Sequence, residues 1–175
     1  MKCLNKSECA EWLRQQQIKA LCDDKTPCVI GDYEIAFHTP KESSAQQNLA
    51  RDLIAWLGEF ETVLFWITDW PFHKADEDTL IWRLRKSHGE NRLMIDAPGH
   101  LFNFEEKEEL IGWVYLMMMF GWDGYLFVSP FRQSMIQTSH EDFVWILSSD
   151  KTQFTEIQNK IHEYKLNVWR EDKLA

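Results

Sequence analysis

An aspartate and a histidine recur in the same short pattern, D-x-P-x-H, at two places in this chain of 175 residues. The first copy carries Asp69 and His73, and the second carries Asp96 and His100. Two carboxylates and two imidazoles suit zinc or another divalent transition metal, and a carboxylate can also orient a histidine for acid–base catalysis. Because each copy follows an apolar run typical of a buried strand, we expect both at the strand ends where open parallel sheets bind ligands.

The same residues also suit a simple turn from a strand into a helix. An aspartate at a strand end can accept hydrogen bonds from backbone N–H groups of the turn. The proline two residues later fixes its own φ and moves the preceding residue away from helical geometry. Acidic residues follow each copy, as the positive end of a helix dipole favours. This interpretation explains the aspartates and prolines but not the histidines, so both interpretations stay open.

Two further acidic turns could take part in such chemistry. His140 lies in the stretch SHED, at the tip of a predicted hairpin, where it is either a solvated turn residue or a third metal ligand or acid–base group. Asp123 lies between a glycine that ends a helix and a predicted strand. We expect Asp123 at the amino end of its strand, opposite the two D-x-P-x-H loops, and therefore not in a site with them.

These loops belong to a predicted α/β fold, with residues 1–175 forming a single domain around a mixed sheet. Three buried strands separated by two helices predict a central parallel β-α-β-α-β unit with right-handed connections. The strands cover 62–68, 92–95 and 125–129, and the helices cover about 76–87 and 104–120. Helices are expected on the faces of this sheet, with antiparallel hairpins added to it.

The remaining elements follow from turn and capping signals. Thr39, Pro40 and Glu42 resemble a capping box, and they predict a helix that ends at Gly58. Asp150 is predicted to cap a last helix. Other expected elements are a first helix that begins after Ser7 and runs to about Cys22, hairpins over 28–37 and over 134–138 with 143–149, and a last helix over about 151–166. Asn103 and Glu106 should start the helix over 104–120, whose stretch LMMMF predicts a buried helix.

Composition limits the partners and the compartment. The net charge of −9 argues against a nucleic acid or an anionic membrane as partner, and it is compatible with a basic protein partner. Nine tryptophans make the chain Trp-rich, and Trp70 and Phe72 in the first loop are candidate partner-binding residues. We find no signal peptide and no apolar stretch long enough to span a membrane, which predicts a cytoplasmic protein. The four cysteines, at 3, 9, 22 and 28, are spaced unsuitably for zinc and are expected to be free thiols.

Function is bounded mainly by absent signatures. The sequence contains no dinucleotide-binding glycine motif, Walker A loop, G-x-S-x-G elbow or H-E-x-x-H motif. The leading hypothesis is a soluble, non-enzymatic factor that binds another protein, of the inhibitor, immunity or regulatory type. The alternative is a metal-dependent or acid–base hydrolase that uses the paired loops, with help from His140 and a divalent metal as cofactor. A homo-oligomer with exposed aromatic residues at its interface is a third possibility.

Overall fold

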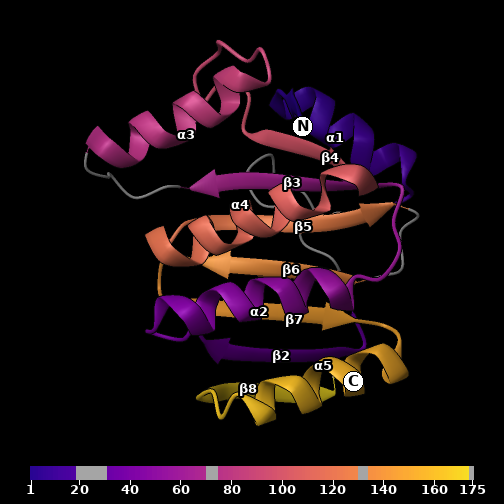
Figure 1. Cartoon of the computed structure of the whole chain (residues 1–175). Helices are drawn as coiled ribbons and strands as arrows, with labels where there is room; N and C mark the ends of the chain where they lie inside the picture. Colours follow the sequence, from indigo (N-terminus) through magenta and orange to yellow (C-terminus); the bar gives the residue numbers. More distant parts are fainter. Residues whose placement is uncertain (19–30, 70–74, 130–133, 174–175) are drawn as a thin grey trace.

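The computed structural model describes residues 1–18, 31–69, 75–129 and 134–173. In this part of the chain, one eight-stranded sheet has α1 on one face and α2, α4 and α5 on the opposite face, while α3 lies above β3 and β4 in the view of Figure 1. The strands are β1 (Lys2–Leu4), β2 (Tyr33–His38), β3 (Thr62–Asp69), β4 (Gly99–Asn103), β5 (Asp123–Ser129), β6 (Ser134–Ser139), β7 (Phe143–Ser148) and β8 (Val168–Lys173). The helices are α1 (Lys6–Gln15), α2 (Ser43–Trp56), α3 (Ala75–Ser87), the 3₁₀ turn η1 (Phe104–Glu106), α4 (Lys107–Phe120) and α5 (Lys151–Glu163).

The sheet is antiparallel throughout, so the predicted α/β class is confirmed but the predicted parallel unit is wrong. The strand order is β1-β4-β3-β5-β6-β7-β2-β8, and every neighbouring pair is antiparallel. β3 lies between β4 and β5 and is antiparallel to both. The helix α4 therefore does join two strands that run in the same direction, but β3 separates them. The predicted hairpin of β6 and β7 is confirmed.

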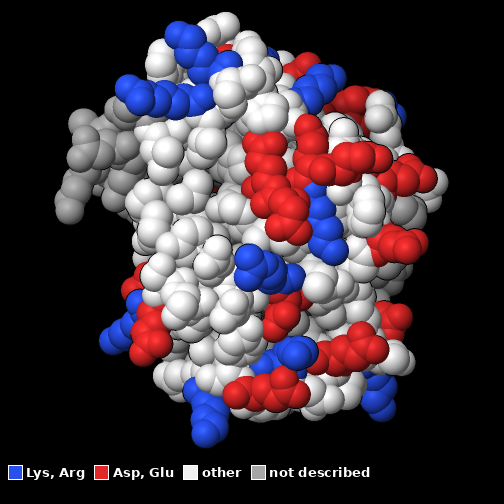
Figure 2. Space-filling view, in the orientation of Figure 1, with Lys and Arg blue, Asp and Glu red and all other residues white. Residues whose placement is uncertain are grey.

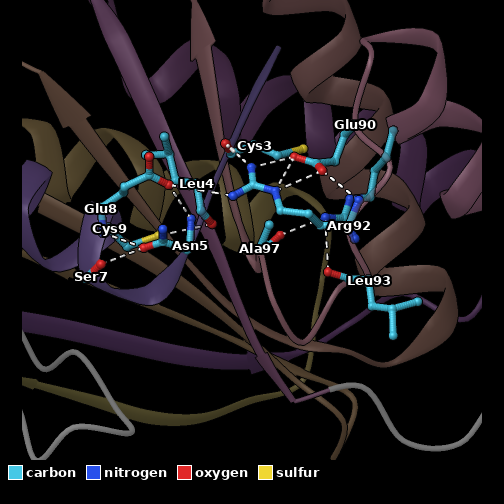
Figure 3. A network of polar contacts seen from close by, with 11 residues as sticks. Cys3, Leu4, Asn5, Ser7, Glu8, Cys9, Glu90, Arg92, Leu93 and Ala97 are labelled. Carbon is cyan, nitrogen blue, oxygen red and sulfur yellow. Dashed lines mark hydrogen bonds and ion pairs between the residues drawn. The ribbon is translucent and has the colours of Figure 1, made fainter.

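The prediction of a strand over 92–95 is also wrong. This segment forms a turn instead, and arginine side chains hold the turn by hydrogen bonds. The guanidinium of Arg85 donates to the carbonyls of Ala97, at 2.9 Å, and Leu93, at 3.5 Å. Arg92 donates to the carbonyl of Cys3 at 3.1 Å and to the carboxylate of Glu90 at 2.6 Å (Figure 3). Leu93 is 63% exposed, and the strand that pairs with β3 starts later, at Gly99.

The helices agree with their capping signals except at α2. Asn103 donates its backbone N–H to Glu106, as predicted, and the Asp150 side chain caps α5 by accepting from two backbone N–H groups. Gly121 ends α4 with φ of 61°, in the left-handed region that glycine favours. Thr39 does not cap α2, because its hydroxyl donates to the carbonyl of Asp142 at 3.0 Å. α2 starts only at Ser43, and the first half of the hairpin predicted over 28–37 lies outside the described residues.

The two faces of the sheet bury separate apolar clusters. The larger cluster lies under α2, α4 and α5, with Trp113, Leu126 and Ile146 fully or almost fully buried. The smaller cluster lies under α1 and contains Cys9 and Phe127. Among the described helices, none is long and apolar enough to cross a membrane.

Candidate functional site

Three side chains with metal-binding or acid–base chemistry meet at one edge of the sheet. β3 ends at Asp69, β5 begins at Asp123, and the two residues are directly opposite each other across the antiparallel pair. His140 follows the last residue of the neighbouring strand β6. A register shift between Ile67 and Asp69 marks a bulge in β3, and bulges of this kind change the direction of the following side chain. One ligand atom from each of Asp69, Asp123 and His140 lies within 4.8 Å of the others.

The contact between Asp123 and His140 is the tightest in this cluster. Nδ1 of His140 lies 3.0 Å from each carboxylate oxygen of Asp123, and the backbone N–H of His140 donates to the same carboxylate at 2.7 Å. The hydrogen bond with Asp123 and the negative charges of Asp123 and Asp69 raise the pKa of His140. Asp123 therefore orients the imidazole and favours its protonated form when no other cation is bound.

The prediction that Asp123 lies at the opposite end of the strands from Asp69 is wrong, because it assumed parallel strands. In an antiparallel pair the start of one strand lies beside the end of its neighbour, which puts Asp123 beside Asp69. The turn signal W-D-G was visible in the sequence, but only the strand direction reveals its partner. Asp69 and His140 were both candidate residues, and the structure brings these two together.

The other candidate residues lie elsewhere or outside the described residues. Asp96 is exposed in the turn before β4, and the second D-x-P-x-H copy thus precedes a strand instead of following one. His73, Trp70 and Phe72 lie outside the described residues. Of the second copy, Gly99 and His100 belong to β4, and neither faces solvent.

His100 is a core residue on β4. It is fully buried, and its ring centroid lies 4.6 Å from that of Trp113. Burial, followed by the positive charge of Arg85, lowers the pKa of His100 to about 3. The imidazole is therefore neutral at physiological pH, and its place between β1 and β3 leaves it no access to a solvent-borne substrate.

A second titratable cluster joins the amino group of Met1 to His88, which follows α3, and to Glu106 and Glu109 at the start of α4. Nε2 of His88 lies 2.7 Å from Glu109, and Nδ1 lies 3.3 Å from the amino group of Met1. The same amino group forms an ion pair with Glu106. Burial alone would raise the pKa of Glu106, but the hydrogen bonds from the Met1 amino group and from Asn103 outweigh it and lower the pKa. A positive charge already lies among these carboxylates, so the cluster works as an ion-pair network.

The outer surface of α4, defined by Gly112, Tyr115, Leu116 and Met119, differs from an ordinary surface helix. These positions recur at helical spacing on the side away from Leu110, Val114 and Met117, which are fully buried. A helix on a protein surface normally carries polar residues on that side. Met117 and Met118 are buried, Leu116 and Phe120 are half-buried and Met119 is 40% exposed, so the expectation of a buried helix at LMMMF is confirmed only in part.

Acidic side chains border this outer surface. The N-terminal part of α4 and the turn before it carry four acids, Glu105, Glu106, Glu108 and Glu109. Figure 2 shows red side chains gathered over the N-terminal half of α4 and an uncharged area over its C-terminal half. The surface thus combines apolar contact area with negative charge at one end.

Comparison with known proteins gives no relative. No known protein family, curated protein or solved structure matches the chain.

Proposed function

We propose that the protein is a binding factor that receives a basic protein partner on the outer surface of α4. The observation that carries this proposal is the apolar line of Gly112, Tyr115, Leu116 and Met119 on the outer side of α4, where Met119 is exposed and the other three are half-buried. Exposed apolar area of this kind is typical of interaction sites when polar residues border it. The two free cysteines that are described, Cys3 and Cys9, are both buried, which supports the cytoplasmic location that we propose for this factor.

Charge defines the chemistry of the partner. Glu105, Glu108 and Glu109 flank the apolar line, and the whole chain has a net charge of −9. A partner with lysine or arginine beside an apolar segment would complement both features, because opposite charges steer association and suppress wrong partners. A second copy of the same acidic chain would be repelled by the same field. Trp70 and Phe72, outside the described residues, remain proposed additional contacts of this partner.

Replacing Met119 by Asp should abolish most partner binding while leaving the fold intact. Met119 is exposed, so the charge meets water in the free protein but lies in the proposed interface of the complex. Capture from cells that contain the protein naturally should yield a basic protein in an amount that falls at least tenfold with Met119→Asp. Quantitative mass spectrometry measures this yield, and about 0.5 M salt should lower it for the unchanged protein as well.

Leu93→Asp is the matched control, because Leu93 is an exposed leucine on another segment. This variant should capture the partner as well as the unchanged protein does. Equal capture by the Met119→Asp variant, or capture only of acidic proteins, would refute the proposal. If light scattering shows a dimer and Met119→Asp dissociates it, the surface binds a second copy of the chain and not a basic partner.

Gly112 provides a second and opposite test. A Cβ atom at Gly112 would meet no described atom within 4 Å, so packing within the chain does not require glycine there. A glycine in a helix interior costs about 1 kcal/mol relative to alanine. Gly112→Ala should therefore raise the free energy of unfolding by up to about 1 kcal/mol in urea denaturation. If the partner backbone approaches α4 at this point, Gly112→Leu should at the same time weaken partner capture, whereas unchanged capture would remove Gly112 from the contact.

Hydrolysis at the sheet edge is the second candidate function, and the meeting of Asp69, Asp123 and His140 favours it. A carboxylate paired with a histidine can move a proton to or from a substrate. A cavity of about 750 Å³ lies at the same end of the sheet, beyond the turn that carries His140. Its lining carries two lysines, Lys41 and Lys165, and two acids, Glu141 and Asp142, so polar groups of both charges are available to a substrate.

A further inference from the structure

We propose that Asp69, Asp123 and His140 form a binding site for a divalent transition-metal ion, of the Mn²⁺ or Zn²⁺ class. The three side chains come from the end of β3, the start of β5 and the turn after β6, so the sheet itself brings them together. This site lies at the edge of the sheet and does not depend on partner binding by α4.

The distances within the cluster match those between ligands of one ion. Metal–nitrogen and metal–oxygen bonds of about 2.1 Å place two ligands at a right angle about 3.0 Å apart, and two opposite ligands about 4.2 Å apart. Nδ1 of His140 and the oxygens of Asp123 are 3.0 Å apart. The three ligand atoms are all within 4.8 Å of one another. The Asp69 side chain is exposed, so it can move toward an ion without disturbing the core.

The donor set selects the class of ion. Two carboxylates balance the charge of a divalent cation, and an imidazole nitrogen favours Mn²⁺, Fe²⁺, Co²⁺ or Zn²⁺ over Ca²⁺ and Mg²⁺. The metal would replace the proton shared by His140 and Asp123, since a ligating nitrogen must be unprotonated. Water would fill the remaining coordination positions, because His140 and Asp69 are exposed.

An electrostatic cost in the metal-free fold supports the same conclusion. Asp69 and Asp123 are direct cross-strand neighbours, and like charges in that arrangement destabilise a sheet. Among the described residues, His140 is the group that forms a salt bridge with this pair. A bound divalent cation would neutralise both carboxylates, so metal binding should also stabilise the folded chain. In the His88 cluster, by contrast, the Met1 amino group already provides the positive charge.

The test is titration of the full chain, prepared without a histidine tag and stripped with chelator, with Mn²⁺, Co²⁺ or Zn²⁺. Calorimetry should show one ion per chain, and a bound ion should raise the melting temperature. His140→Gln and Asp123→Asn should each weaken the affinity at least tenfold, while visible absorption of bound Co²⁺ should report nitrogen and oxygen ligands. His88→Gln is the matched control and should leave the affinity unchanged.

Each result decides the question separately from protein binding. Absence of saturable binding up to about 1 mM of any of the three ions would refute the site, as would binding that His140→Gln leaves intact. A loss of binding with His88→Gln would move the metal to the other cluster and equally refute this assignment. Circular dichroism of the variants checks that they are folded, and Asp69→Asn, at an exposed position, repeats the test with the least effect on packing.

Discussion

Gly99→Ala should destabilise the folded protein by about 1–3 kcal/mol, the range typical of overpacked cores. Gly99 is buried at the start of β4, between Leu4 of β1 and Trp66 of β3. A Cβ atom there would overlap Sγ of Cys9 and lie 3.2 Å from Cβ and 3.3 Å from the carbonyl oxygen of Leu4. The Leu4 backbone is fixed by the sheet, so the extra carbon can be accommodated only by displacing α1 or β1. Urea denaturation measures the loss as a lower midpoint with an unchanged slope.

Cys9 supplies the matched second variant. Its thiol is fully buried, and burial raises its pKa to about 12, so it packs as a small apolar group. Cys9→Ala removes the sulfur that the new Cβ would overlap, and the double variant should be more stable than the sum of the two single changes implies, by about 1 kcal/mol. Simple additivity would show that the Leu4 backbone and not the Cys9 sulfur limits the space at Gly99.

The sequence predicted local structure well because local signals control it. The capping of η1, the turn that leads into α4, by Asn103 and Glu106 and the left-handed Gly121 depend on residues only a few positions apart. Strand direction depends on where a connection delivers the chain, which a buried apolar run does not encode. Residues 88–98 bring the chain back to the C-terminal end of β3. The next strand, β4, therefore starts there, with Gly99 opposite Trp66, and runs antiparallel to β3.

The same limitation explains how much of the candidate site could be predicted. Asp69 and His140 were recognised from their residue types and turn positions, whereas Asp123 needed the antiparallel pairing. The segment RLMI has the apolar character of a strand, yet buried Arg85 binds the carbonyl of Leu93 and that of Ala97 just after the segment, and the Leu93 side chain is exposed. The two D-x-P-x-H copies are accordingly alike in sequence but not in place, since one ends a strand and the other precedes one.

His100 should make the protein lose stability in mild acid, below about pH 6.5. The pKa of His100 is lowered to about 3 in the folded protein, because the buried ring cannot take up a proton at low cost. In the unfolded chain the same ring has a pKa of about 6.5, so between pH 6.5 and 3 the unfolded chain binds more protons. Stability is therefore fully present above pH 6.5 and decreases as the pH falls, by about 2 kcal/mol between pH 7.5 and 5.

Measurement of the urea midpoint from pH 7.5 to 5 separates His100 from the other titrating groups. The hydrogen bond from Arg92 lowers the pKa of Glu90 to about 2, and the stability that Glu90 contributes is lost only below about pH 4.5. The raised pKa of His140 acts in the opposite direction, because its contribution is fully present below about pH 6.5 and is lost at higher pH. His100→Phe keeps a ring against Trp113 and removes the titrating group, so its stability should not decrease over this interval. A pH dependence that is the same in the variant would show that His100 takes up its proton inside the folded core.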